Sequence, residues 1–318
     1  VVTGLGAITP VGKTVQEFWE SVVAGRSGVR RLQCFDPTNF TCQIAAEVLD
    51  FDPQEYMPAK EAKKTDRFVH FAVVSSEEAV KDSKLDMDSE DKDRIGVIIG
   101  SGIGGLHTVE REHKKYVERG PVKGPGKISP FLIPRLIANM GAGQVSIHFG
   151  ARGPNFAVVT ACASGNHSIG EALRIIQKGE ADVMIAGGTE AAISVMGFGG
   201  FCALRAMSIR NDQPETASRP FDKERDGFVI GEGAGTLILE EMERALKRKA
   251  HIYCELVGYG SSGDAYHMTA PDPEGTGAMR CMKACMDDAG LKPGDIDYIN
   301  AHGTSTIYND RIETLAIK

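Results

Sequence analysis

The chain has 318 residues, enough to bury a large core or two fused half-domains. Its hydrophobic share of 42% and charged share of 25% are typical of an ordered globular protein and exclude a disordered chain. No apolar run approaches the ~20 residues that cross a bilayer, and the formal net charge of -7 argues against bulk binding of nucleic acid.

Short apolar strands alternate with helical patterns along the chain. The strands are predicted at residues 1–4, 94–100, 156–161, 183–186 and 236–239, and the helices at residues 15–24, 62–82, 130–149 and 164–178. A charged stretch at residues 110–127 predicts a solvated helix followed by a loop. This alternation indicates an α/β protein whose mainly parallel sheet is covered by helices.

Seven cysteines are scattered along the chain, and none forms a Cys-x-x-Cys pair. An odd number without paired spacing makes a zinc site unlikely and favours a reducing, cytoplasmic compartment. Cys281 and Cys285 share a face of a predicted helix, where small buried side chains are expected. Because the chain opens on Val1 within a predicted strand, we find no signal peptide and expect the natural start upstream.

Residues 155–166 run an apolar strand into a helix with Cys162 at the corner. Small residues flank this cysteine on both sides, as a tight strand-to-helix turn requires. Unpaired backbone N–H groups at the start of the helix would face the sulfur and favour the thiolate, which is the attacking form. A random cysteine is more often a buried structural residue, but this turn favours a nucleophile.

One stretch of the sequence is repeated. Residues 79–102 predict a helix, an acidic spacer and a strand ending at Gly-Ser-Gly, and residues 281–304 repeat that order and end at His-Gly-Thr. The opening Val-Val-Thr-Gly-Leu-Gly has a counterpart in Glu-Leu-Val-Gly-Tyr-Gly at residues 255–260. Two copies of one βα architecture, starting near residues 1 and 251, would explain both matches, and we expect the second copy to be incomplete.

Four motifs together resemble those of the β-ketoacyl-acyl carrier protein synthases. In chain order they are Gly-Ser-Gly-Ile-Gly-Gly at 100–105, Thr-Ala-Cys-Ala-Ser-Gly at 160–165, Ser-Arg-Pro-Phe-Asp at 218–222 with Arg-Asp-Gly at 225–227, and Asn-Ala-His-Gly-Thr-Ser-Thr at 300–306. The resemblance covers the whole chain and is greatest to the type II condensing enzymes of fatty acid synthesis. It implies the pseudo-duplicated thiolase fold, with a first half at residues 1–250 that holds the nucleophile and inserted cap and docking segments, and the start of a second half at residues 251–318.

The resemblance also implies a decarboxylative Claisen condensation. Cys162 would accept an acyl chain from the phosphopantetheine thiol of acyl carrier protein as a thioester. Malonyl-acyl carrier protein would then lose CO₂, and its carbanion would attack the thioester and lengthen the chain by two carbons. His302 matches the first of the family's two catalytic histidines, whose imidazole stabilises the enolate oxygen, and the N–H of Cys162 would form half of the oxyanion hole.

Further residues match binding positions of the family. Thr304 and Thr306 match hydroxyls that hold the pantetheine arm, Ile103 matches the apolar gatekeeper of the acyl pocket, and Phe201 matches a mobile gating aromatic. Read without the resemblance, the threonines are turn residues and Phe201 is core. No organic cofactor is implied, but three positions match ligands of a structural monovalent cation: Asn300, the carbonyl of Ala301, and Glu313.

Acyl carrier protein is an acidic partner, so docking needs a local basic patch. The residues that fall at docking positions or extend them are Lys60, Lys63, Lys64, Lys127 and Arg205. Such a cluster is otherwise a solvated face. Members of the family are usually homodimers in which central strands pair across a two-fold axis, and residues 156–160 are our candidate for that seam. Neither a nucleic-acid nor a membrane partner is expected.

The sequence also departs from the family. Its members continue through a lysine segment, a second catalytic histidine and a glycine-rich phenylalanine loop, none of which is present. His267 belongs to a different motif near the carrier-protein entrance, so it does not fill the vacancy. We therefore expect a truncated condensing enzyme that acylates poorly and does not sustain condensation.

Three other classes compete with this interpretation. The Gly-x-Gly-x-x-Gly at residues 100–105 fits a dinucleotide loop, but the acidic residue expected after the next strand is missing. A non-catalytic chain-length partner, or an inactive fragment, is the stronger rival, and Cys162 argues against it because such partners typically lack the nucleophile. A cysteine hydrolase would need an acidic orienter near His302, which the sequence does not identify.

Overall fold

The computed structural model describes residues 1–318, which divide into two compact units. Unit 1 comprises Val1–Arg26, Glu47–Phe198 and Gly231–Glu255. Unit 2 comprises Ser27–Ala46, Gly199–Ile230 and Leu256–Lys318. None of the helices combines the length and the apolar character that crossing a membrane requires.

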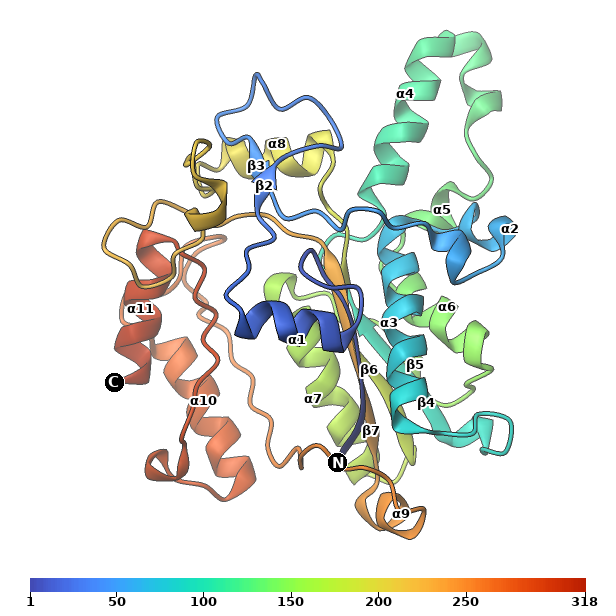
Figure 1. Cartoon of the computed structure of the whole chain (residues 1–318), viewed down its shortest axis with the longest axis vertical. Coiled ribbons are helices and arrows are strands. Elements are labelled where there is room, and N and C mark those ends of the chain that lie inside the picture. The colour runs from blue at the N-terminus through green and yellow to red at the C-terminus, as the bar shows by residue number, and fades with distance from the viewer. The chain divides into compact units, whose positions relative to one another are not determined.

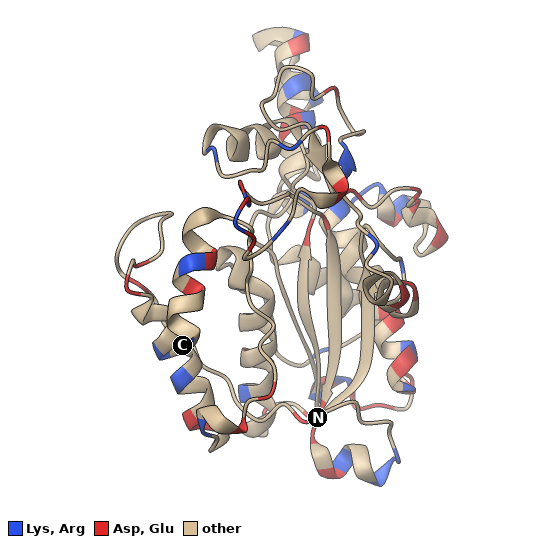
Figure 2. Ribbon diagram, turned by 60° about the vertical axis from the view of Figure 1, so that its left-hand side comes forward, with Lys and Arg blue, Asp and Glu red and all other residues tan.

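The centre of unit 1 is a five-stranded mixed sheet in the order β1-β7-β6-β4-β5. β4 runs parallel to β5 and to β6, whereas β7 is antiparallel to both β6 and β1. The strands are almost free of charge along their length (Figure 2), which suits a sheet that is covered on both faces. Their bounds are β1 Val2–Ile8, β4 Ile95–Gly100, β5 Asn155–Phe156, β6 Val183–Glu190 and β7 Gly233–Glu240.

Helices cover both faces of this sheet. α3 (Arg67–Ser83) and α6 (Met140–Phe149) lie on one side, and α7 (Ser164–Gln177) lies on the other (Figure 1). Phe68 and Phe71 of α3 are fully buried and join the β-branched side chains of the strands in one core. The predicted α/β class is therefore confirmed.

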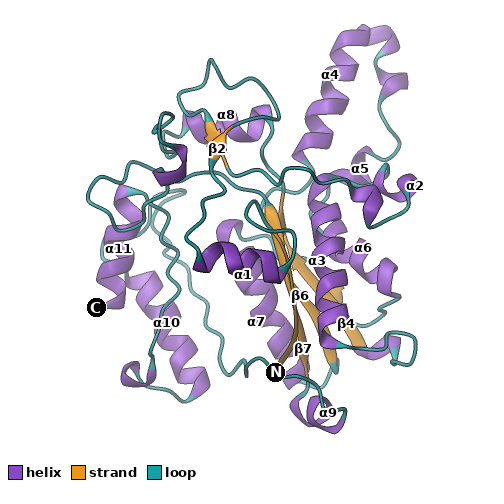
Figure 3. Ribbon diagram, in the orientation of Figure 1, coloured by secondary structure: helices purple, strands orange, loops and turns teal.

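The remaining helices are shorter or lie outside these two layers (Figure 3). The longest, α4, contains a kink at Gly120, whose φ of 71° is left-handed and which precedes Pro121. Unit 2 holds a two-stranded ladder of β2 (Arg30–Arg31) and β3 (Ile44–Ala45). The other helices are α1 Val15–Val23, α2 Ala59–Ala62, α4 Leu106–Lys123, α5 Leu132–Leu136, α8 Val195–Ala203, α9 Met242–Lys247, α10 Thr276–Ala289 and α11 Ile307–Ile317.

The internal repeat of the sequence is visible as a repeated contact between a glycine pair and a helix. A Cβ added to Gly4 or Gly6 would lie 2.2 Å from the Ala79 carbonyl oxygen or 1.8 Å from that of Ser75, both on α3. Between these glycines, the N–H of Leu5 donates to Asp82 Oδ2 at 2.9 Å. The glycines thus allow the strand to lie directly on the helix backbone.

The second copy shows the same arrangement on α10. A Cβ added to Gly258 or Gly260 would lie 2.5 Å from the Cys285 oxygen or 2.3 Å from the Cys281 oxygen. Between them, the N–H of Tyr259 donates to Asp288 Oδ2 at 2.9 Å. In both copies an aspartate stands three residues after the helix residue that the first glycine contacts, which explains why the two stretches of sequence resemble each other.

Several predicted elements differ from the structure. The strand predicted at residues 156–161 is wrong beyond β5, because the N–H of Thr160 donates to Ser164 Oγ at 2.9 Å instead of to a strand, and Phe156 and Val159 are 40% and 57% exposed. The strand expected at residues 296–301 is also wrong, since no other segment forms a ladder with it.

Two predicted helices differ from the structure in their extent. The helix predicted at residues 62–82 begins only at Arg67, as α3, because Ala62 ends α2 and Asp66 accepts the N–H of Thr108 at 3.0 Å. The pattern at residues 130–149 spans α5 and α6, and the chain leaves the helix at Ile137, whose ψ is 132°. Hydrophobic periodicity therefore did not locate either boundary, and α5 has no buried residue although its sequence continues the pattern of α6.

The Gly6 contact predicts a specific loss of stability. In Gly6→Ala the new methyl group would meet the Ser75 carbonyl, so β1 and α3 must separate, and we expect the free energy of unfolding to fall by about 3 kcal/mol. Gly235→Ala on β7 is the matched control, because no atom lies within 4 Å of its added Cβ, and should change it by less than about 1 kcal/mol. Urea unfolding measures both, and equal effects would contradict the packing.

Candidate active site

Cys162 lies in a single 3₁₀ turn, Ala161–Ala163, between the end of the β5 segment and the start of α7. Ala161 has a φ of 50°, in the left-handed region that non-glycine residues rarely occupy. Such a backbone costs about 1 kcal/mol or more and persists only where the surroundings enforce it. The strained residue is the one that turns the exposed Cys162 outward at the corner, as the sequence predicted.

Side chains around the corner hold this turn closed. Ser164 Oγ donates to the carbonyl of Ala161 at 2.7 Å and accepts the N–H of Thr160 at 2.9 Å. The hydroxyl of Thr160 is also hydrogen-bonded to His167 Nδ1 at 2.9 Å. These bonds replace the strand ladder that ends at Phe156 and stabilise the strained conformation.

Glycines bring α7 onto the sheet at the level of the corner. A Cβ added to Gly100 of β4 would lie 2.5 Å from the Ser164 carbonyl, and one added to Gly188 of β6 would lie 3.0 Å from Gly165 Cα. α7 can therefore begin two residues after Cys162, and the positive end of its dipole favours negative charge on the sulfur.

The loop that follows β4 packs beside the same corner. A Cβ added to Gly102 would lie 3.4 Å from Ala161 Cα, so the two backbones are in contact. Ile103, the predicted gatekeeper, is the next residue and is 38% exposed. The structure thus brings the first two motifs of the resemblance together in unit 1.

The other two motifs come together in unit 2. Asp310, which is only 1% exposed, accepts the N–H groups of Phe221 at 2.7 Å and Ser305 at 3.2 Å and pairs with Arg225 at 3.3 Å. Ser305 Oγ in turn accepts the N–H of Arg219 at 3.0 Å. Sequence analysis missed Asp310, although its position in the first turn of a helix after a threonine cap was a usable signal.

His302 is exposed in the loop that precedes α11. Its N–H donates to Glu313 Oε1 at 2.6 Å, and the N–H of Gly303 donates to Glu313 Oε2 at 2.9 Å. Thr306 caps α11 by accepting the N–H of Asn309, and its hydroxyl lies 2.8 Å from that of Thr304. One carboxylate therefore fixes the backbone of the predicted catalytic histidine, and both threonines have structural contacts, while their binding of pantetheine stays a prediction.

The three residues predicted to hold a cation are compatible with one. Glu313 Oε1 accepts the N–H of His302 and keeps a further lone pair, whereas Oε2 accepts both the N–H of Gly303 and the side-chain amide of Asn309; Asn300 and Ala301 would add neutral oxygens. A single carboxylate with neutral oxygens suits a monovalent ion better than a divalent one. The chain holds no group of three or more His, Cys, Asp or Glu side chains suited to a metal ion.

The predicted gating aromatic and docking residues lie in different units. Phe201 in α8 is half-buried against Phe228, with ring centroids 5.4 Å apart in an edge-to-face arrangement. Lys60 and Lys63 are exposed at α2, and the ammonium of Lys64 lies 5.8 Å from the ring centroid of Phe131. Lys127 is exposed in unit 1, and Arg205 is exposed in unit 2.

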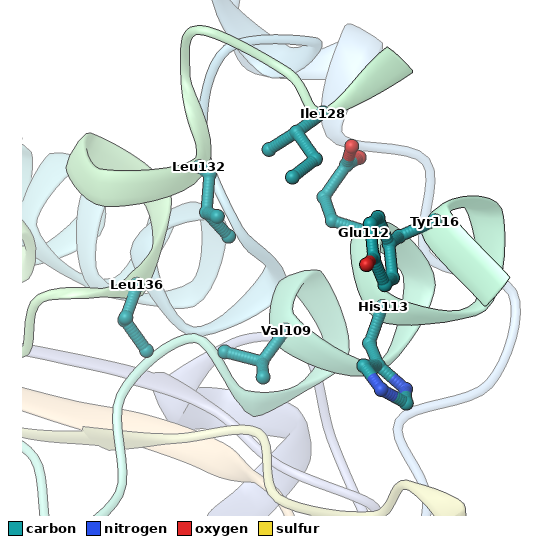
Figure 4. A pocket seen from close by; sticks show the side chains of 7 residues that line it. All are labelled: Val109, Glu112, His113, Tyr116, Ile128, Leu132 and Leu136. Carbon is teal, nitrogen blue, oxygen red and sulfur yellow. The ribbon is translucent and has the colours of Figure 1, made fainter. Parts of the chain in front are cut away.

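A separate apolar pocket of about 310 Å³ lies between α4 and α5 (Figure 4). Its one carboxylate, Glu112, accepts hydrogen bonds from Lys115 Nζ at 2.8 Å and from the N–H of Ser129 at 3.0 Å. None of the predicted site residues lines it. Those that do are Val109, Glu112, His113, Tyr116, Ile128, Leu132 and Leu136.

Comparison with known proteins agrees with this geometry. The family model "Beta-ketoacyl synthase, N-terminal domain" matches residues 1–245, and "Beta-ketoacyl synthase, C-terminal domain" matches residues 253–318. The 3-oxoacyl-[acyl-carrier-protein] synthase 2 of Synechocystis is 53% identical over 318 residues, and that of Coxiella burnetii is 52% identical. The chain spans 76% of the length of each.

Solved structures show the same fold. A β-ketoacyl synthase from Burkholderia phymatum superposes with a TM-score of 0.91 at 35% identity, with 99% of this chain and 76% of that chain covered. A type II PKS ketosynthase, solved in complex with its acyl-carrier protein, has a TM-score of 0.90 at 36% identity, with 100% and 76% covered. The chain belongs to the β-ketoacyl synthase family, and the expected thiolase-like fold is confirmed.

Proposed function

We propose that this chain carries the acyl-accepting site of a 3-oxoacyl-acyl carrier protein synthase. The reaction is the elongation of an acyl chain by two carbons through decarboxylative condensation with malonyl-acyl carrier protein. The observation that supports this most is the exposed Cys162 beside the left-handed Ala161, with α7 starting behind it. The names and identities of the relatives in both comparisons support the same reaction.

The first half-reaction is a transthioesterification. The thiolate of Cys162 attacks the thioester carbonyl of the acyl donor, a new C–S bond forms, and the pantetheine sulfur leaves and takes a proton. Backbone N–H groups at the corner stabilise the tetrahedral oxyanion. The corner favours this step because it holds the sulfur at the positive end of α7 without any movement of the backbone.

The second half-reaction forms a carbon–carbon bond. The malonyl C–C bond to the carboxylate breaks and CO₂ leaves, and the resulting enolate attacks the acyl carbonyl on Cys162 and releases the sulfur. We assign stabilisation of the enolate oxygen to the imidazole of His302. Glu313 holds the backbone there by accepting the N–H groups of His302 and Gly303, and Thr304 and Thr306 offer hydroxyls to the pantetheine arm.

A chain-length partner is the second candidate, because a solved structure titled as a ketosynthase/chain length factor has a TM-score of 0.91 at 35% identity. A non-catalytic chain-length partner would not require a strained backbone that exposes a cysteine thiol, because such strain is retained mainly at functional sites. The corner therefore favours the catalytic alternative.

Further parts of the proposal concern partners and setting. A homodimer is supported by β5, an edge strand whose outer side has no neighbour and whose Phe156 is 40% exposed. A monovalent cation at Asn300, Ala301 and Glu313 would fix the loop of His302 when bound. The scattered cysteines favour a reducing cytoplasm.

Incubation with octanoyl-acyl carrier protein tests the acyl-accepting site. We expect intact-mass spectrometry to show one octanoyl group per chain and peptide mapping to place it on Cys162. Cys42 is the internal control, since burial raises the pKa of its thiol to about 11 and leaves almost no thiolate at pH 8. Octanoyl groups on other cysteines, with Cys162 spared, would reject the proposal.

Charge reversal tests the proposed docking patch. In Lys63→Glu/Lys64→Glu we expect acylation by octanoyl-acyl carrier protein to slow by about tenfold, because the acidic partner is repelled, while acylation by octanoyl-coenzyme A stays within about twofold. The double variant Lys81→Glu/Lys247→Glu makes the same change in net charge elsewhere in unit 1 and should leave both rates unchanged. Equal slowing with both donors would contradict docking at this patch.

A further inference from the structure

Glu190 is the last residue of β6, and its carboxylate faces the loop that follows β4. The two strands are parallel neighbours with Gly100 opposite Gly188, so their carboxyl ends meet at one edge of the sheet. Glu190 Oε2 accepts the N–H of Gly102 at 2.8 Å, and Oε1 accepts the hydroxyl of Ser101 at 3.2 Å. No motif in the sequence singled out this glutamate.

The backbone N–H groups of Ile103 and Ala191 also favour the ionised form of this carboxylate. Burial raises the pKa of this carboxyl, and the surrounding N–H and hydroxyl groups oppose that effect because they favour the ionised form. The hydrogen bonds from Ser101 and Gly102 hold the loop at two successive residues. Ser101 extends the network, since its hydroxyl accepts the N–H of Gly104 at 3.0 Å.

This network reaches the nucleophile corner through Gly102. A Cβ added there would lie 3.0 Å from Glu190 Oε2 on one side and 3.4 Å from Ala161 Cα on the other. The glycine backbone is therefore packed between the carboxylate and the strained residue that precedes Cys162. Because no side chain lies between Gly102 and Ala161, a displacement of the loop would displace the backbone at Ala161.

We infer that Glu190 is a positioning residue for acyl transfer: by holding Gly102 and Ile103 against Ala161, it sets where the Ile103 side chain lies relative to the sulfur of Cys162. This inference rests on the proposed function. A carboxylate is required because it only accepts, whereas a glutamine would turn two donor hydrogens toward backbone N–H groups that also donate.

The test compares Glu190→Gln with Glu78→Gln. Glu78 on α3 is a matched control, because its carboxylate also accepts two backbone N–H groups, of Ala7 and Val15, each at 2.8 Å, and burial also raises its pKa. Neither contact involves residues 101–104 or 160–164. Both variants remove one charge from a partly buried carboxylate that holds a loop.

Two readouts separate positioning from general stability. Hydrogen–deuterium exchange reports on residues 101–104, and the ratio of the dodecanoyl to the butyryl transfer rate onto Cys162 reports on the gate. In Glu190→Gln we expect exchange at residues 101–104 to quicken and the ratio to fall by about tenfold, because a displaced Ile103 obstructs the long chain more than the short one. In Glu78→Gln both should match the wild type.

An unchanged ratio or unchanged exchange in Glu190→Gln would overturn the inference, as would the same fall in Glu78→Gln. If Glu190→Gln does not fold, Ser101→Ala removes one donor and must lower the ratio in the same direction.

A wild-type chain that accepts neither acyl group contradicts the proposed function instead. In that case the alkylation rates of Cys162 by N-octylmaleimide and by N-methylmaleimide replace the acyl-transfer rates. A ratio of these two alkylation rates that is the same in Glu190→Gln as in the wild type overturns the inference.

Discussion

The arrangement of this site depends on one constraint, the close approach of α7 to the strands β4 and β6. Only glycine fits at Gly100, where a methyl group would strike the Ser164 carbonyl, and Gly188 and Gly165 approach each other almost as closely. This contact fixes where α7 begins. The chain must then turn sharply before it, and Ala161 absorbs the turn by adopting a left-handed backbone.

Side-chain carboxylates that accept backbone N–H groups hold the functional loops. Glu190 fixes the loop after β4, Glu313 fixes the loop of His302, and Asp310 joins two motifs that are about eighty residues apart in sequence. In each case a carboxylate accepts at least one backbone N–H group of a loop. Such loops stay rigid while leaving space around them for a substrate.

The sequence predicted more of the corner than of its surroundings. Small residues around Cys162 and the period of the following helix led to the correct position of α7, since both depend on local chemistry. The repeat was also detectable, because the glycine pairs at Gly4 and Gly258 meet the same steric demand. The division of the chain near residue 250 and the roles of the site residues remain predictions.

What the sequence did not predict depends on long-range contacts. The strand at residues 156–161 looked continuous because its residues favour strands, yet Thr160 bonds to Ser164 instead. Glu190 gave little signal, because a carboxylate that accepts N–H groups from a distant loop cannot be told from a surface charge before the topology is known. For Asp310 the threonine cap indicated a helix start but not the distant partners. Periodicity likewise could not locate the breaks at Asp66 and Ile137.

The most direct test of the central claim is a crystal structure of the chain after acylation by octanoyl-acyl carrier protein. The account predicts electron density for the acyl group on the sulfur of Cys162, with residue 161 retaining a positive φ and Gly102 in contact with it. A sulfur packed inside the core, with residue 161 in an ordinary right-handed or extended conformation, would contradict it.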